Sequence, residues 1–108
     1  MMSESEFHKI ADLWLTLTAD VLEEADQKGV LETELEDGAL AILFPSGKQL
    51  LISKHTPMRQ LWLASPVSGG LHFSFDGTVN QWTLSDGRSL NDVLAGELKT
   101  IAGISIAW

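Results

Sequence analysis

The sequence of 108 residues contains no cysteine and only three prolines. Without cysteine the chain cannot form a disulfide, a zinc–thiolate centre, an iron–sulfur cluster held by its own thiolates or a thiol nucleophile. No apolar run approaches the roughly 20 residues that a membrane-spanning helix requires. Residues 1–6 are polar and acidic, unlike a signal peptide or an arginine-rich transit sequence. We therefore expect a cytoplasmic protein with no membrane partner.

Basic residues are also scarce, with seven lysines and arginines against fifteen acids and a net charge of −8. Nucleic acids and anionic membranes bind basic surfaces, so this balance argues against both as partners. Residues 1–37 carry a net charge of −9, whereas residues 38–108 carry +1. The excess negative charge therefore lies in the first third of the chain, where it would attract cations or a basic protein patch.

What remains has the composition of one folded domain covering residues 1–108, with 44% hydrophobic residues. A first helix is predicted at about residues 4–27. Ser3 and Glu6 form a capping box, and Lys28-Gly29 would end the helix. The apolar stripe between them recurs at helical spacing and consists of Phe7, Ile10, Trp14, Leu17 and Val21, widened by Leu13, Leu15 and Leu22.

Short strands are predicted to follow the first helix. From Leu31 apolar and acidic residues alternate, which predicts a strand with one buried face. Asp37-Gly38 predicts a type I′ hairpin turn, because both central residues of that turn need positive φ. Further strands are expected at residues 39–44, 50–53, 60–64, 71–75 and 81–84.

A second helix is predicted to begin after Ser89 and to end at Gly103. Its apolar face consists of Leu90, Val93, Leu94, Leu98 and Ile101. The apolar tail, residues 104–108, should lie against the domain. This order of elements predicts an α+β fold, a two-layer αβ-sandwich with both helices on one face of an antiparallel sheet of five to six strands.

The acidic residues fall in two neighbouring segments. Four end the first helix, where the negative end of the helix dipole disfavours them: Asp20, Glu23, Glu24 and Asp26. Three more share one face of the first strand: Glu32, Glu34 and Glu36. If that strand forms the sheet edge beside the helix end, seven carboxylates line one ridge. Carboxylate oxygens suit hard cations such as Mg²⁺, Ca²⁺, Mn²⁺ and iron, and an open ridge predicts weak, partly hydrated sites.

Two other uses of these acids stay open, a solvated face that protects an edge strand and a docking site for an arginine-rich protein. Elsewhere, His8 has Glu4 and Asp12 four residues to either side and could share a cation with them. If Leu61 and Leu63 face the core, Trp62 points outward as a candidate partner anchor. None of the three histidines has a serine or cysteine nucleophile placed beside it by a recognisable motif, so no hydrolase site is visible.

Together these residues resemble the bacterial frataxin (CyaY) family over nearly the whole chain. The resemblance rests on residues 5–12 (SEFHKIAD), the acidic helix end and first strand, residues 38–42, and the P-x-x-Q-x-W-L-A pattern at 57–64. Gly70, His72, Phe73 and Trp82 also fall where the family has them. The resemblance implies an iron-binding accessory protein of iron–sulfur cluster assembly, not an enzyme, which modulates the cysteine desulfurase and scaffold proteins as an iron donor or iron-dependent regulator.

The resemblance also implies roles for individual residues. Weak Fe²⁺ or Fe³⁺ binding, with other cations able to substitute, is assigned to Asp20, Glu23, Glu24, Asp26, Glu32 and Glu34, with secondary sites at His8 and Asp12. Partner contact is assigned to Glu23, Glu24, Glu32, Glu34, Gln60 and Trp62. The chain departs from the family at Ser53 and His55. It also departs at Thr18 and Ala19, two positions where the family often has acids. A monomer that metal can drive into oligomers is expected. The alternative function is an acidic protein-binding regulator whose metal binding is incidental; ferroxidase activity would need a redox-competent iron site.

Overall fold

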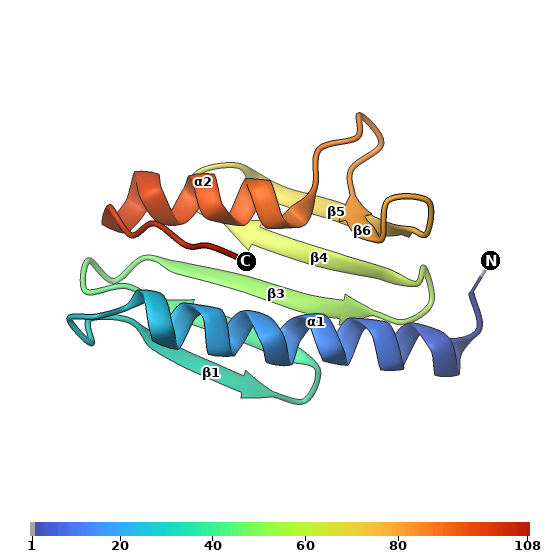
Figure 1. Ribbon diagram of the computed structural model, residues 1–108, viewed down its shortest axis with the longest axis horizontal. Helices are drawn as coiled ribbons and strands as arrows, with labels where there is room; N and C mark the ends of the chain where they lie inside the picture. Colours follow the sequence, from blue (N-terminus) through green and yellow to red (C-terminus); the bar gives the residue numbers. More distant parts are fainter. Residues whose placement is uncertain (1) are drawn as a thin grey trace.

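Both helices lie on the same face of a six-stranded antiparallel sheet, as Figure 1 shows for the computed structural model, which describes residues 2–108. The elements are α1 (Glu4–Ala25), β1 (Glu32–Glu36), β2 (Ala39–Leu43), β3 (Gln49–His55), β4 (Gln60–Ser65), β5 (Gly69–Asp76), β6 (Gln81–Thr83) and α2 (Leu90–Ala102). The strands follow one another in chain order across the sheet, so β1 and β6 form its edges. The predicted two-layer α+β sandwich is confirmed.

Local signals in the sequence fix most element ends as predicted. The hydroxyl oxygens of Ser3 and Ser89 accept from the backbone N–H groups three residues on, each at 3.1 Å, and so cap the two helices. Gly103 ends α2 in the left-handed conformation with φ of +68°. Asp37 and Gly38, with φ of +51° and +74°, form the predicted turn between β1 and β2. β3 and β5 are longer than predicted.

The core lies between the helices and the sheet. It is built from alternating residues of β2 to β6 and from one face of each helix. Its largest fully buried members include Phe7, Leu15, Leu22, Leu40, Ile42, Leu50, Ile52, Leu61, Leu63, Phe73, Trp82 and Leu90. α1 contacts β1 and β2, while α2 contacts β6 at the other side of the sheet. The helices therefore cover this side of the sheet except at its β1 edge, and the opposite face is open.

The buried face of α1 differs from the predicted stripe. The buried residues are Phe7, Ala11, Leu15, Thr18 and Leu22. Leu13 and Leu17, which were expected on that face, are 59% and 52% exposed. Apolar residues cover more than half of the circumference of this helix, so their spacing does not define its centre. The face that meets the sheet instead includes the small residues Ala11 and Thr18.

The end of α1 is also shorter than predicted. The helix ends at Ala25, and the Asp26 carboxylate accepts from the backbone N–H groups of Val30 and Leu31 at 2.9 and 2.8 Å. Gly29 takes positive φ in the turn that follows, not at the helix end itself. Asp26 therefore holds the connection between α1 and β1.

The prediction that β1 buries one face was wrong, because all five of its residues are exposed. Thr33 and Leu35 do point to the helix side, since they pair with Ile42 and Leu40 of the core. As β1 is an edge strand beside α1, nothing covers that side fully, and Leu35 remains 43% exposed.

The C-terminal tail returns between the two helices (Figure 1). Ile106 packs against the core, and the Trp108 ring lies 5.8 Å from that of Trp14. Trp14 is only half-buried, and its Nε1 donates to Asn91 Oδ1 at 2.7 Å, which links α1 to α2. Within residues 2–108, neither helix is long and apolar enough to cross a membrane.

Thr18→Val should stabilise the protein. Thr18 is 0% exposed, and its hydroxyl has no hydrogen-bond partner within the described residues. Removing a buried, unpaired hydroxyl from an otherwise apolar site should raise the free energy of unfolding by about 1–2 kcal/mol. Urea denaturation followed by circular dichroism measures this. The control Thr16→Val, at an exposed position of the same helix, should change it by less than about 0.5 kcal/mol. An unchanged or lower value for Thr18→Val would show that the hydroxyl is satisfied.

Candidate metal and partner surface

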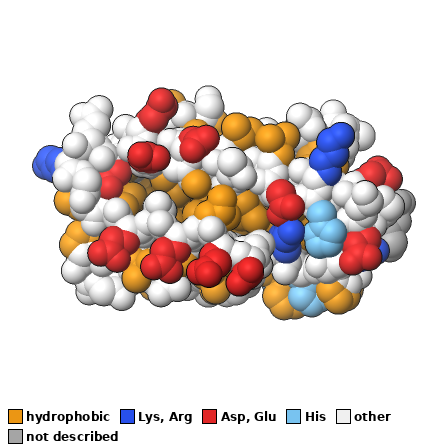
Figure 2. Space-filling model, turned by 90° about the horizontal axis from the view of Figure 1, so that it is seen from below, with side chains coloured by type: hydrophobic (Ala, Val, Ile, Leu, Met, Phe, Trp, Pro, Cys, Tyr) orange, Lys and Arg blue, Asp and Glu red, His pale blue; other side chains and the backbone are white. Residues whose placement is uncertain are grey.

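The acidic residues lie along the edge of the molecule that α1 and β1 form. Figure 2 shows them as two rows, one over α1 and one over β1, with hydrophobic surface between. The helix row consists of Asp20, Glu23 and Glu24, which line one shallow depression. The strand row consists of Glu32, Glu34 and Glu36. β1 is the edge strand and α1 contacts it, which is the arrangement that the ridge prediction required.

The pairing register separates the two rows across the sheet edge. Glu32, Glu34 and Glu36 pair with Leu43, Ala41 and Ala39, whereas the alternate β2 residues point into the core. The strand row therefore projects from the open face, while the helix row belongs to the helix layer. Neighbours within the strand row are about 7 Å apart by strand geometry. The ridge is thus two separate rows, and the helix-side residues of β1, Thr33 and Leu35, belong to neither.

The six row carboxylates are exposed and, among the described residues, take part in no ion pair or side-chain hydrogen bond. No three His, Asp or Glu side chains within residues 2–108 are grouped closely enough to hold one ion together. A cation at the rows would therefore have few protein ligands at a time and keep much of its water. Asp26, the other acid assigned to metal, uses both oxygens to hold the α1–β1 connection.

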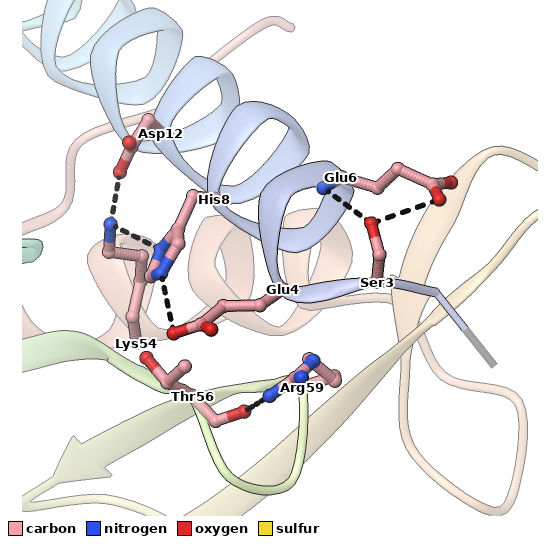
Figure 3. Close-up of polar contacts among 8 residues, drawn as sticks. All are labelled: Ser3, Glu4, Glu6, His8, Asp12, Lys54, Thr56 and Arg59. Carbon is pink, nitrogen blue, oxygen red and sulfur yellow. Dashed lines mark hydrogen bonds and ion pairs between the residues drawn. The ribbon is translucent and has the colours of Figure 1, made fainter.

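His8 and Asp12, the secondary metal residues, face the sheet near the start of α1 (Figure 3). Lys54 of β3 lies between them. Its Nζ donates to Asp12 Oδ1 at 2.7 Å and lies 3.1 Å from His8 Nδ1. Glu4 Oε1 lies 3.7 Å from His8 Nε2. The structure thus brings the predicted residues together, but around a lysine that sequence reasoning did not include.

Trp62 lies on the open face, as predicted, because its neighbours Leu61 and Leu63 are buried. Its indole is stacked between two imidazoles, with ring centroids 3.8 Å from His55 and 4.0 Å from His72. Its Nε1 donates to Gln60 Oε1 at 2.9 Å. The stack was not predicted; His72 pairs with Trp62 across β4 and β5, so both side chains point to the open face.

The open face continues past the stack into a hollow over β5 and β6. Its lining includes His72, Ser74, Asp76 and Thr83. Hydrogen bonds from the hydroxyl and backbone N–H of Thr78 hold the pKa of the Asp76 carboxyl below its ordinary value. Of the predicted partner residues, Glu32, Glu34, Gln60 and Trp62 share this open face, whereas Glu23 and Glu24 lie on the helix layer.

Salt should stabilise the protein, because the row carboxylates repel one another without compensating cations. Raising the ionic strength from ~0.01 to ~0.15 M shortens the screening length from about 30 to 8 Å. We expect the melting temperature to rise by a few degrees, and millimolar Mg²⁺ or Ca²⁺ to raise it further by binding the folded state. Circular dichroism at matched pH measures both effects. An unchanged melting temperature would mean that the carboxylates are too far apart to interact.

Comparison with known sequences finds matches over almost the whole chain. The frataxin-like domain family matches residues 1–104. The iron-sulfur cluster assembly protein CyaY of Azotobacter vinelandii is 38% identical over 97 residues, which cover 87% of this chain and 84% of that protein.

Solved structures show the same fold. Frataxin from Psychromonas ingrahamii superposes with a TM-score of 0.86 over 97% of this chain and 96% of its own, at 21% identity. A trimeric frataxin of the yeast Saccharomyces cerevisiae, complexed with ferrous iron, has a TM-score of 0.72 at 32% identity and covers 84% of this chain and 83% of its own.

Proposed function

The chain belongs to the frataxin-like family, as its sequence motifs indicated, and we propose that it is an iron-binding accessory protein of iron–sulfur cluster assembly rather than an enzyme. In this role it acts in the cytoplasm on a cysteine desulfurase and a scaffold protein, as an iron donor or an iron-dependent regulator. The name of the Azotobacter relative and the ferrous complex of the yeast relative support the process and the metal.

The observation that carries the proposal is the two rows of carboxylates at the sheet edge, which form no ion pairs among the described residues. Hard oxygen ligands suit iron, and a row offers a cation few protein ligands at a time. Iron bound in this way is cargo, because water and partner side chains can replace its ligands one after another. Other divalent or trivalent cations are expected to substitute at the same carboxylates.

The same geometry supports a regulatory effect of iron on docking. The strand row shares the open face with Gln60 and Trp62, so a partner seated on this face would contact both. Iron at the rows cancels negative charge that would otherwise attract a basic partner surface. Iron and partner would therefore influence each other's binding to the edge, in amounts that must be equal by linkage.

The alternative is an acidic protein-binding regulator whose metal binding is incidental, and the stacked Trp62 favours it as a second candidate. The two functions separate in a pull-down against a cysteine desulfurase with iron and with chelator. The leading proposal predicts that iron changes either the binding of this protein to the desulfurase or the effect of that binding on cluster formation. The alternative expects the same result in both conditions.

Metal binding itself is tested by anaerobic Fe²⁺ titration followed through backbone amide NMR signals. We expect broadening centred on residues 20–36. Broadening confined to other residues, with this segment untouched, would contradict the assignment of iron to the acid rows. Analytical ultracentrifugation of the same samples tests the expected monomer and its metal-driven oligomers.

A further inference from the structure

Lys54 is a charged residue in an inward-facing position of the sheet. It pairs with buried Leu61 across β3 and β4, so its side chain starts on the helix side, and only 16% of that side chain is exposed. The stem crosses Gly38, where an added Cβ would come within 2.5 Å of Lys54 Cε. Gly38 thus has two roles. Its positive φ allows the turn, and its lack of a side chain leaves room for the Lys54 side chain. The backbone N–H of Lys54 donates to Gly38 O at 3.0 Å, which holds the two segments together.

The ammonium group ends between two groups that bind metals in other proteins. It lies 2.7 Å from Asp12 Oδ1 and 3.1 Å from His8 Nδ1 (Figure 3). An ammonium can only donate, so the Nδ1 lone pair accepts and the proton of the neutral imidazole is on Nε2. That nitrogen faces Glu4 Oε1 at 3.7 Å. Lys54 therefore uses the lone pair and the carboxylate oxygen through which His8 and Asp12 would bind a metal ion.

We propose that Lys54 is an internal cation that closes the two-ligand site formed by His8 and Asp12 against divalent metals. His8 and Asp12 lie four residues apart on one face of α1, so without the lysine this pair of side chains can bind one ion together. The lysine is tethered beside them at an effective concentration in the millimolar range, whereas a free metal must displace it from solution. The closed site confines metal to the acid rows. The inference rests on the proposed function only for the identity of the natural metal.

The test uses Zn²⁺ alone as the probe, because it is diamagnetic and binds imidazole and carboxylate. The Nδ1 resonance of the His8 imidazole, assigned with His8→Ala, reports direct coordination. In the native protein we expect it to stay in place at Zn²⁺ concentrations that shift the amides of residues 20–36. Lys54→Met keeps the length of the side chain and removes its charge. In this variant we expect Zn²⁺ to move the resonance, with half-saturation at a Zn²⁺ concentration at least about tenfold lower than in the native protein.

Two variants serve as matched controls. Lys9→Met removes the same charge next to His8, but Lys9 is exposed and, among residues 2–108, forms no hydrogen bond or ion pair with His8 or Asp12, so the site should stay closed. Lys54→Arg keeps the cation and should also leave it closed. Coordination of His8 in the native protein at the same Zn²⁺ concentration as in Lys54→Met would overturn the proposal, as would a folded Lys54→Met that gains no site. If Lys54→Met does not fold, the Zn²⁺ titration of the native protein still tests whether the His8 site is closed. The amides of residues 20–36 report separately on the acid rows.

Discussion

Replacing Glu23, Glu24, Glu32 and Glu34 together by glutamine should weaken Fe²⁺ binding at the edge by more than about tenfold and at the same time raise the melting temperature. Four of the six row carboxylates are lost, and each provides ligand oxygens that a neutral amide replaces poorly. Relief of like-charge repulsion contributes a few tenths of a kcal/mol for each neighbouring pair. A total of about 1 kcal/mol corresponds to a rise of ~4–8 °C for a domain of this size. Calorimetric Fe²⁺ titration and thermal denaturation measure the two effects.

The separation of the two rows makes a sharper prediction possible with two half variants. Glu32→Gln with Glu34→Gln changes only the open face, whereas Glu23→Gln with Glu24→Gln changes only the helix layer. Both should weaken iron binding, but the loss of partner binding should come mainly from the strand pair. Equal losses of partner binding from both pairs would mean that the partner contacts both rows. Undiminished binding of the fourfold variant to the desulfurase in chelator would contradict the alternative function.

The sequence predicted the number and order of the elements well because caps, turns and alternation are local. Ser3, Ser89 and Gly103 act within three or four residues of their own position, and Asp37-Gly38 determines its own turn. The face of α1 was predicted less well, because its apolar residues cover too wide an arc to indicate which of them meets the sheet. The prediction that β1 buries one face was wrong for a related reason. Alternation shows which side a residue points to, but whether anything covers that side depends on the place of the strand in the sheet.

The candidate site shows the same division between local and distant information. The charge asymmetry of the first 37 residues located the acids, and alternation put three of them on one face of a strand. That this face is the open side of the sheet follows only from the β1–β2 register. Lys54 was missed because it reaches Asp12 across 42 residues of sequence, with no local pattern to connect them. His55 was recognised as a departure from the family, but its stacking on Trp62 needs the β3–β4 pairing.

Trp62→Ala should reduce binding to the desulfurase–scaffold machinery by at least about 2 kcal/mol, or roughly 30-fold, with little loss of stability. Trp62 lies on the open face among groups that a partner can reach, and stacking with two imidazoles fixes its ring in one orientation before binding. A fixed aromatic side chain loses little conformational freedom when a partner docks, so more of its contact energy appears as affinity. Calorimetry or a quantitative pull-down against the purified machinery measures the change.

Two further tryptophan variants separate a binding role for this side chain from a structural one. Trp62→Phe keeps an aromatic ring between His55 and His72 but removes the N–H that donates to Gln60, and it should retain most of the affinity. Trp82→Ala deletes a ring that is only 2% exposed, and it should cost about 3–5 kcal/mol of folding stability. If a folded Trp62→Ala binds the machinery as the native protein does, docking does not use this part of the open face. If instead it melts as early as Trp82→Ala, the stack stabilises the sheet, because a residue needed only for docking would leave the folded state nearly unchanged.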